Sequence, residues 1–393
     1  MKLISYLQKE EDLIRAKEAG LEEVIIGTDV FSRFGSLTID KANDLAKKCL
    51  ALKIRPVFEW DVLMVQTKFE IIVPKLNEVD FNSFKAIRVQ DPGAFGYILE
   101  HYPNLPIQLN LETGNHNLIG IQRWIDSAKE RVERIILSIE FPKAKLEEYI
   151  TKLKVSVEFL GLGRILLFYT PRSLLGPLVF DHDDSEVVSV HNRPIEVYGS
   201  SEESPHSGFP IIENRHGTFM FNIKDHCLLE NFLELQQMNL AYCRIDLRFV
   251  EQNTNLLKDI QTLNDSFDSE LAKSIKEKYP AKVIRGYYQV NKSDALFSKL
   301  KNKRTLRNDE NYLGDILEVN KKKHLGLLIR NESRQLKVGD QIEIRTPDGK
   351  VKNTVIHELK NSKHESLEEA SNGQVVFFSH VSGVSVKSSV YLA

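Results

Sequence analysis

Residues 23–61 read EVIIGTDVFSRFGSLTIDKANDLAKKCLALKIRPVFEWD, and this stretch decides the fold. Glu23–Gly27 and Arg55–Asp61 are short apolar runs of strand length. Between them, from Thr38 to Leu52, apolar residues recur at helical spacing behind a threonine that can cap the helix. A strand, a helix and a second strand in this order indicate a parallel sheet with crossover helices.

The same alternation continues to about residue 250. The further runs of strand length are Leu3–Tyr6, Ala86–Gln90, Pro106–Asn110, Arg134–Glu140, Ser156–Gly161 and Cys243–Phe249. Eight strands in roughly 250 residues match a closed (β/α)8 TIM-like barrel. We therefore expect an α/β barrel domain over residues 1–290. We also expect an insertion around residues 176–208, because the interval from Thr170 to Leu235 is longer than one repeat.

The sequence changes character after residue 290. Residues 291–311 are rich in Lys and Arg and are expected to form a basic linker. Such a linker could contact RNA phosphates, although a solvated connection is the commoner role of a charge run. Residues 312–393 consist of short alternating runs with turn signals such as Asp348-Gly349. This pattern is typical of a small antiparallel β-barrel.

Composition restricts the compartment and the partners. The 393 residues carry a formal net charge of −2, so any contact with a polyanion must come from a local patch. The three cysteines, Cys49, Cys227 and Cys243, lie far apart, which suits a reducing compartment. The first residues do not resemble a signal peptide, and no apolar run has the length of a membrane span. We expect a cytoplasmic protein without a membrane or DNA partner.

Polar residues recur two positions apart in the expected strands. The sets are Glu59/Asp61, Arg88/Gln90, Gln108/Asn110/Glu112, Ser138/Glu140, Ser156/Glu158 and Arg244/Asp246/Arg248. Side chains at this spacing share one face, and helices cover the outer face of a barrel strand. We therefore expect these side chains to point into the lumen near the carboxyl ends of the strands. Because buried charge is costly unless it is paired or hydrated, they predict a polar pocket. The alternative is an ion-pair lattice that closes the barrel.

Arg244-Ile-Asp246-Leu-Arg248 is the densest of these sets. Two guanidinium groups beside a carboxylate could clamp a carboxylate or phosphate substrate, or the three side chains could satisfy one another. Elsewhere, His182 and Asp184 are weak metal candidates, because one His in an acidic loop is a poor ligand set. We find no glycine-rich phosphate loop and no serine nucleophile elbow, so spacing alone assigns no reaction.

Several segments resemble peptidase family U32, the collagenase-like proteases. Residues 18–27 (EAGLEEVIIG) resemble the opening strand of the family, and residues 31–35 (FSRFG) resemble the segment that follows it. Residues 89–93 (VQDPG) match one of its turns. Residues 158–175 resemble its signature block, and residues 209–229 resemble the segments that follow. The resemblance extends in order along almost the whole chain. It implies a barrel followed by a C-terminal β-barrel similar to domain two of translation elongation factors.

The resemblance also implies functions and a cofactor. The family name comes from a reported collagenase activity, but better-understood members hydroxylate tRNA or ribosomal RNA bases or support ubiquinone hydroxylation. Many hold an iron–sulfur cluster on four cysteines in and after the signature block. Here Leu166 and Ser173 stand where that block has cysteines, and Cys227 alone matches a later position. One thiolate cannot hold a cluster that needs about four, so no cofactor is expected.

Tyr169, Arg172, Lys224 and Asp225 match positions of the family motifs and are candidates for substrate contact. The candidate pocket therefore comprises Glu59, Asp61, Gln90, Asn110, Glu140, Glu158, Tyr169, Arg172, Asp225, Arg244, Asp246 and Arg248. The resemblance implies three functions: hydroxylation-type modification of RNA or a cofactor, which ranks first; a non-catalytic partner or scaffold of a related U32 protein; and a peptidase. RNA or such a relative is the expected partner.

Overall fold

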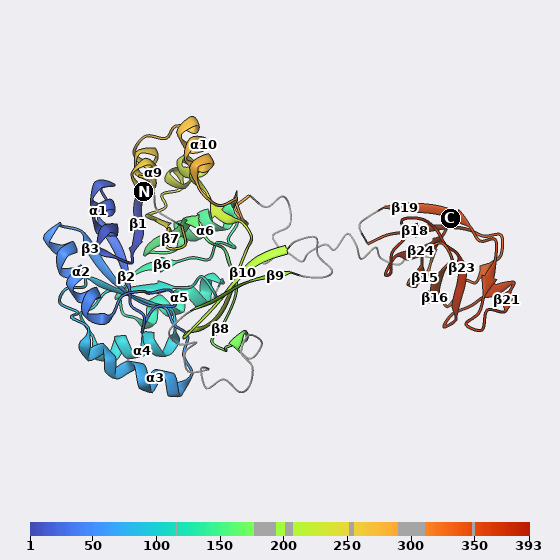
Figure 1. The fold of residues 1–393 in the computed structure, drawn as a ribbon, viewed down its shortest axis with the longest axis horizontal. Helices are drawn as coiled ribbons and strands as arrows, with labels where there is room; N and C mark the ends of the chain where they lie inside the picture. Colours follow the sequence, from blue (N-terminus) through green and yellow to red (C-terminus); the bar gives the residue numbers. More distant parts are fainter. Residues whose placement is uncertain (115, 177–193, 201–206, 251–254, 290–310, 348–349) are drawn as a thin grey trace. The chain divides into compact units, whose positions relative to one another are not determined.

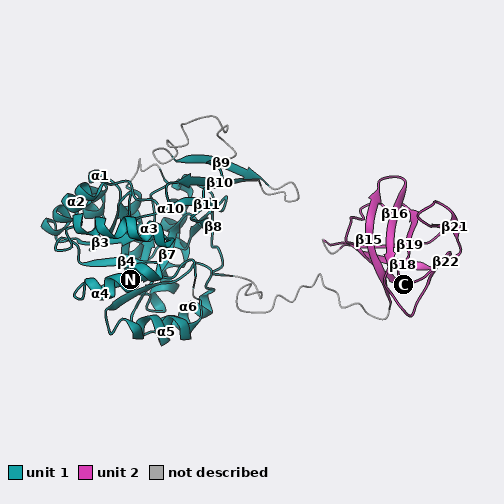
Figure 2. Cartoon of the chain, turned by 90° about the horizontal axis from the view of Figure 1, so that it is seen from below, with its two compact units in different colours: residues 1–292 teal, residues 293–393 magenta. Residues whose placement is uncertain are grey.

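The computed structural model describes residues 1–114, 116–176, 194–200, 207–250, 255–289, 311–347 and 350–393. The chain forms two compact units, residues 1–292 and 293–393 (Figure 2). The predicted linker at 291–311 lies outside the described residues except for residue 311, as do His182 and Asp184. Among the described helices, none is long and apolar enough to cross a membrane.

The first unit is built around a closed ring of parallel strands (Figure 1). Its members in the described chain are β1 (Lys2–Leu7), β2 (Glu23–Gly27), β3 (Arg55–Trp60), β4 (Ala86–Val89), β5 (Ile107–Asn110), β6 (Val132–Ile136), β7 (Ser156–Gly163) and β13 (Tyr242–Ile245). Each strand pairs with the next, and β13 pairs with both β7 and β1, which closes the ring. The predicted (β/α)8 TIM-like barrel is confirmed.

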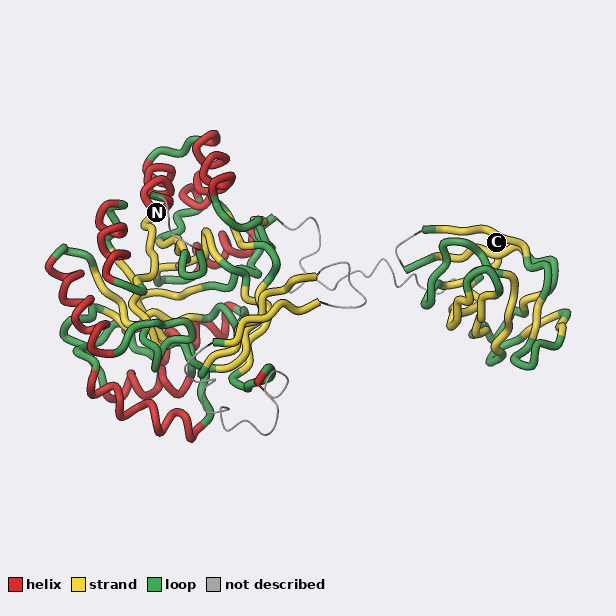
Figure 3. Tube along the Cα trace, viewed as in Figure 1, coloured by secondary structure: helices red, strands yellow, loops and turns green. Residues whose placement is uncertain are grey.

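Helices surround this ring (Figure 3). They are α1 (Glu10–Glu18), α2 (Ile39–Ala51), α3 (Gln66–Ile72), α4 (Pro92–His101), α5 (Leu118–Ser127), α6 (Lys143–Lys152), α8 (Phe232–Gln237), α9 (Leu256–Asp265) and α10 (Ser269–Lys278), with short turns η1 (Val73–Glu78) and η3 (Leu229–Asn231). In α2, the Thr38 hydroxyl accepts a hydrogen bond from the Lys41 amide, as the capping pattern predicts. The buried face of α2 carries Leu45, Ala46 and Cys49.

β3 shows how each strand separates an apolar face from a polar face. Trp60 stacks on Phe69 of α3 with ring centroids 6.2 Å apart, and Phe58 contacts Phe84 at 5.1 Å. Glu59 lies between these two residues in sequence and points the other way, into the lumen, where it accepts a hydrogen bond from Tyr6 of β1. The hydrophobic core therefore lies between strands and helices, and the lumen receives polar side chains.

After β7, an antiparallel sheet interrupts the β/α alternation. Within the described ranges its strands are β8 (Leu166–Thr170), β9 (Ile195–Ser200), β10 (Ser207–Asn214) and β11 (Gly217–Phe221), in the order β8-β11-β10-β9. Phe219 and Phe221 pack against Phe34, which follows β2, and Phe221 also contacts Phe249, which follows β13. The sheet is therefore seated on the carboxyl end of the barrel.

Two short strands extend the barrel sheet at the same end. β12 (Asp225–Cys227) pairs antiparallel with the last residues of β7, and β14 (Val283–Ile284) pairs in parallel with β12. The chain thus returns to the barrel mouth after α10.

The second unit is antiparallel throughout its described strands. They are β15 (Tyr312–Asn320), β16 (His324–Ile329), β17 (Leu336–Lys337), β18 (Gln341–Arg345), β19 (Val351–Val355), β20 (Leu359–Lys360), β21 (Ser366–Leu367), β22 (Glu369–Ala370), β23 (Val375–Ser379) and β24 (Ser389–Leu392). Their inward side chains form one apolar core that includes Leu313, Leu327, Ile344, Val376 and Val390. This agrees with the small antiparallel barrel expected from the alternating runs.

Candidate functional site

Charged side chains fill the lower part of the barrel lumen, towards the amino ends of the strands. Glu23 of β2 accepts hydrogen bonds from both terminal nitrogens of Arg134, at 2.6 and 3.1 Å. Glu158 of β7 accepts from Arg88 at 2.5 Å and contacts Arg134 at 3.3 Å. Gln108 bridges Arg88 and Glu23. All five side chains are buried. We call this set the lower lattice.

Arg244 of β13 connects the lower lattice to the space above it. One terminal nitrogen lies 3.0 Å from Oε1 of Glu158, and the other is paired with Glu112, which follows β5. Burial opposes the charge of Arg244, but Glu112 and neighbouring acidic groups hold its pKa well above the ordinary value. Arg244 therefore stays cationic and fixes Glu112 at the barrel mouth.

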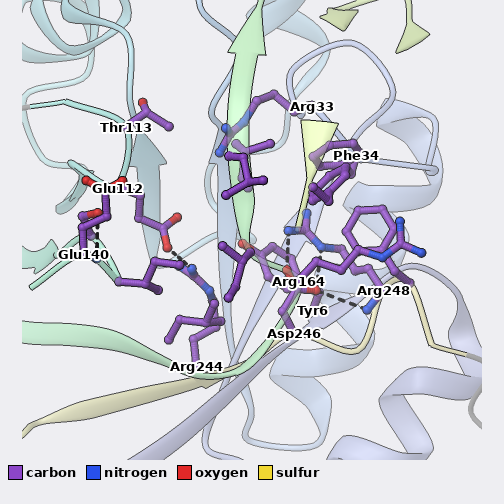
Figure 4. A pocket seen from close by; sticks show the side chains of 18 of the residues that line it. Tyr6, Arg33, Phe34, Glu112, Thr113, Glu140, Arg164, Arg244, Asp246 and Arg248 are labelled. Carbon is purple, nitrogen blue, oxygen red and sulfur yellow. Dashed lines mark hydrogen bonds and ion pairs between the residues drawn. The ribbon is translucent and has the colours of Figure 1, made fainter. Parts of the chain in front are cut away.

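Above the lattice, a pocket opens at the carboxyl ends of the strands (Figure 4). Glu112, Thr113 and Glu140 lie on one side of it, and Arg33, Phe34, Arg164 and Arg248 lie on the other. The pocket is therefore bipolar, with an acidic wall from the ends of β5 and β6 and a basic, aromatic wall from β7, β13 and the loop after β2.

Arg248 and Asp246 form the centre of the basic wall. Nε of Arg248 donates to Oδ1 of Asp246 at 2.9 Å, and Nη2 donates to Oδ2 at 2.7 Å. The Arg248 guanidinium lies 3.4 Å from the centre of the Tyr6 ring, a cation–π contact. Residues 244–248 do not form one self-contained bridge, because Asp246 is paired with Arg248 while Arg244 contacts Glu158 and Glu112. The clamp for a carboxylate or phosphate stays a prediction.

Three arginines of the basic wall keep hydrogen-bonding capacity. The Nη1 atoms of Arg33, Arg164 and Arg248 are buried and have no hydrogen-bond partner among the described residues. Nη1 of Arg248 faces Oε2 of Glu59 at 3.6 Å, which is too long for a hydrogen bond. Guanidinium groups bind carboxylates and phosphates well, so this wall can receive an anionic group. The ring of Phe249 lies 4.5 Å from the Arg164 guanidinium and adds a flat apolar surface.

Glu59 and Tyr6 form a hydrogen-bonded pair at the floor of the pocket. The Tyr6 hydroxyl donates to Oε1 of Glu59 at 3.0 Å. Burial, together with the charge of Asp61, raises the pKa of Glu59 to about 7. Burial also disfavours ionisation of Asp61, but Arg33 contacts both of its oxygens at 2.7 Å and keeps the pKa of Asp61 below its ordinary value. Neighbouring carboxyls are thus separated into one that can carry a proton near neutrality and one that stays ionised.

Family models match both units. The model of peptidase family U32 matches residues 8–298, and that of the peptidase family U32 C-terminal domain matches residues 308–390. The chain belongs to peptidase family U32. It is similar to the tRNA hydroxylation protein P of Escherichia coli K12, with 20% identity over 380 residues that cover 84% of this chain and 80% of the relative. The protein of the same name from Haemophilus influenzae is 19% identical over 393 residues, covering 86% and 82%.

A solved U32 structure also shows similarity. The C-terminal domain of a putative U32 peptidase from Geobacillus thermoleovorans shares 18% identity, covers 21% of this chain and 92% of that domain, and gives a TM-score of 0.20.

The lumen brings together most of the residues that strand parity selects. Glu140, Arg244, Asp246 and Arg248 line the pocket, Glu59 lies below it, and Glu158 belongs to the lower lattice. The other three residues, Asp61, Gln90 and Asn110, form hydrogen bonds with loops that follow the strands. Asp61 binds Arg33, Gln90 donates to the Thr113 hydroxyl at 2.5 Å, and Asn110 accepts from the Glu112 amide at 3.0 Å.

Tyr169, Arg172 and Asp225, which the candidate pocket took from the U32 motifs, lie outside the pocket. Tyr169 stacks on Phe219 with ring centroids 4.6 Å apart, and its hydroxyl donates to the carbonyl of His216. Arg172 is exposed on the surface, and Asp225 accepts a hydrogen bond from the Tyr279 hydroxyl at 2.7 Å. None of them is among the residues that line the pocket.

Several lining residues were not predicted, because they follow strands instead of lying within them. Arg33 and Phe34 belong to the FSRFG segment, and Arg164 lies inside the signature-like block. Both segments resemble U32 segments, but the resemblance did not indicate that Arg33, Phe34 or Arg164 lines the pocket.

The cysteines do not fit the iron–sulfur cluster that the U32 resemblance implies. Cys49 lies in α2, Cys227 in β12 and Cys243 in β13, and each is a buried free thiol. Burial raises the pKa of all three thiols, to about 12 for Cys49, which opposes the thiolate form that binds iron. Leu166 lines the pocket and Ser173 is exposed. In the described part of the chain, no group of three or more His, Cys, Asp or Glu could hold a metal ion.

Proposed function

We propose that this protein takes part in hydroxylation-type modification of tRNA and that the pocket at the barrel mouth binds the target nucleotide. The observation that carries the proposal is the basic, aromatic wall, in which Arg33, Arg164 and Arg248 each keep one Nη1 without a hydrogen bond to the described residues. An RNA nucleotide presents the two features that this wall can bind, a phosphate and an unstacked base. The tRNA hydroxylation proteins that resemble this chain over most of its length support the same reading.

The two walls suggest separate tasks for binding. Arg164 and Arg248 would hold an anionic group of the nucleotide, while Phe34 and Phe249 would face the ring. Glu112 and Glu140 on the opposite wall would accept hydrogen bonds from the donor edge of a base. Glu112 is fixed for this task by Arg244, and Glu140 is open to solvent and can adjust.

The test uses a strain that lacks the gene, complemented with single variants. Nucleosides from total tRNA are separated and their hydroxylated forms are measured by mass spectrometry. Arg164→Ala removes a pocket guanidinium and should lower the hydroxylated nucleoside at least tenfold. The control is Arg123→Ala, an exposed arginine of α5 outside the pocket, which should behave as the wild type. Hydroxylation that is unchanged when the gene is absent would overturn the proposal.

A second function is favoured by the cysteine positions. A chain without ligands for the family cluster could serve as the partner of a cluster-bearing relative. In that case the gene is still required for hydroxylation, but the protein purified without oxygen is colourless, lacks iron and retains the relative. A brown protein with stoichiometric iron would exclude this second function.

A further inference from the structure

A second cleft of the first unit is lined by lysines. Lys224 follows β11, Lys273 and Lys276 lie on α10, and Lys282 precedes β14. Glu230 and Glu277 also line this cleft. We call it the lysine cleft. It shares no lining residue with the pocket described above.

The charges of the lysine cleft are not balanced. Glu230 accepts from Lys276 at 3.0 Å and from Arg285 at 3.2 Å, so its single charge is shared by two cations. The side chains of Lys224 and Lys282 are exposed, and in the described structure neither forms an ion pair or a hydrogen bond. The cleft therefore presents an excess of positive charge to solvent, although the chain as a whole carries a formal charge of −2.

Backbone pairing holds these two lysines beside each other. β12 and β14 are parallel, with Asp225 opposite Val283 and His226 opposite Ile284. Lys224 and Lys282 each directly precede the first paired residue, so they emerge at the same end of the ladder. The Asp225 amide donates to the Lys282 carbonyl at 2.9 Å. The Asp225 carboxyl accepts from Tyr279, which anchors the wall of the cleft. The backbone of Lys224 and that of Lys282 are therefore held side by side.

The same segment leads from the lysine cleft to the pocket. β12 pairs with the last residues of β7, at the carboxyl end of the barrel. Gly286 lies against His226, and Tyr287 lines the pocket. The five residue steps from Lys282 to Tyr287 span at most about 18 Å. A ligand long enough to bridge this distance can contact both sites.

We propose that the lysine cleft binds the phosphodiester backbone of the RNA whose target nucleotide enters the pocket. This inference rests on the proposed function and adds a binding surface to it. Lysines without an ion-pair partner in the described structure suit phosphates, because a phosphate is bound through its charge. Every nucleotide carries the same phosphate, so the cleft would position the RNA without reading its sequence. Two of the motif residues contribute to this contact. Lys224 supplies a charge, and Asp225 holds the strand pairing and Tyr279 in place.

The test compares two double variants of the full chain. Lys224→Ala with Lys282→Ala neutralises the cleft. Lys129→Ala with Lys154→Ala removes the same charge from exposed lysines before β6 and β7, at the opposite end of the barrel. Binding of bulk tRNA is measured by fluorescence anisotropy at several KCl concentrations. The cleft variant should bind about tenfold more weakly at 0.1 M salt, and its salt slope should fall by about 1.4, since each lost phosphate contact removes about 0.7. The control variant should change affinity less than about twofold.

The outcomes separate the two proposals. Equal affinities and salt slopes for both double variants and the wild type would overturn the lysine cleft and leave the proposed function standing. If the wild-type chain does not bind tRNA, the proposed function fails together with this inference. A cleft variant that binds tRNA weakly while the control matches the wild type supports both.

Discussion

The space enclosed by the strands of the first unit holds the ion-paired side chains of Glu23, Arg88, Arg134 and Glu158, whereas the strands of the second unit enclose an apolar core. An apolar interior is stabilised by removing surface from water, at about 25 cal/mol per Å², and the direction of each contact matters little. A charged interior must offset the desolvation of each ion through specific partners. The lumen of the first unit therefore depends on individual residues, whereas the interior of the second unit depends on the volume of its core.

The largest effect is expected at Glu158, which contacts Arg88, Arg134 and Arg244. Glu158→Ala leaves these buried cations without their shared partner and should destabilise the first unit by about 3–5 kcal/mol. Urea unfolding followed by tryptophan fluorescence reports on this unit, because both tryptophans, Trp60 and Trp124, lie in it. Glu22→Ala breaks an exposed pair with Lys2 and should cost less than about 1 kcal/mol. Similar losses of unfolding free energy in Glu158→Ala and Glu22→Ala would show that the stability of the first unit does not depend on the ion pairs in its lumen.

The next effect is expected in the second unit. Leu327→Ala opens a cavity in a core where Leu327 is fully buried and should cost about 2–5 kcal/mol. Leu327→Met conserves volume and should cost less than about 1.5 kcal/mol. Thermal unfolding with residue-resolved hydrogen exchange can assign the loss to residues 311–393. If Met were as damaging as Ala, the second unit would depend on specific contacts, as the first does.

The third prediction concerns pH and Glu59. Below about pH 4.5 this carboxyl is protonated in both the folded and the unfolded chain. As pH rises towards 7, the unfolded chain releases this proton while the folded chain retains it, so the wild type loses stability relative to Glu59→Gln. The difference should reach about 3 kcal/mol, because the folded and unfolded pKa values of Glu59 differ by about 2.5, and it should stay constant well above pH 7.

Other groups do not disturb that comparison. Burial lowers the pKa of His216 and of His226 to about 4, which makes the fold more stable as pH rises, but both residues are present in the wild type and the variant. The measurement is the difference in unfolding free energy between the two proteins from pH 4 to 8. A difference that is independent of pH would show that the pKa of Glu59 is the same in the folded and the unfolded chain, and would contradict the prediction.

The smallest effect is expected where the second unit carries charge. Lys337 and Glu369 form an ion pair at 3.2 Å, and both side chains are more than half exposed. Glu369→Ala should change the free energy of unfolding by less than about 1 kcal/mol, measured at low and high salt. A loss of unfolding free energy as large as that of Glu158→Ala would show that exposed ion pairs stabilise this protein as much as the buried ones do.

The regular part of the fold was predictable because its signals are local. Thr38 precedes a helical repeat and caps α2, and the alternation around Glu59 places one face of β3 in the lumen. The two-residue spacing alone, however, could not show which side chains on that face lie in the lower lattice and which line the pocket. Glu158 lies within β7, opposite Ile136 of β6, and belongs to the lower lattice. Glu140 follows the end of β6, which stops at Ile136 and not at Glu140 as expected, and it therefore reaches the pocket.

The rest of the site depends on contacts distant in sequence. Arg33 enters the pocket wall because Asp61, 28 residues away, binds both its backbone amide and its guanidinium. Phe34 and Phe249 meet because the inserted sheet packs on both of them. The spacing of polar and apolar residues along the sequence does not reveal contacts of this kind. The motif at Lys224 and Asp225 was visible, but its place beside Lys282 required the pairing of β12 with β14.

The closure of the ring between β1 and β13 has a consequence for synthesis of the chain. Lys2 pairs with Tyr242, so the first strand has no neighbour on that side until the ribosome has added about 240 further residues. At about 5–20 residues per second, this edge stays open for roughly 10–50 s. Leu3, Ile4 and Leu7, which are buried in the finished barrel, belong to that waiting strand. An unpaired apolar edge invites association with other chains, so the nascent protein passes through its most aggregation-prone period before residue 245 appears.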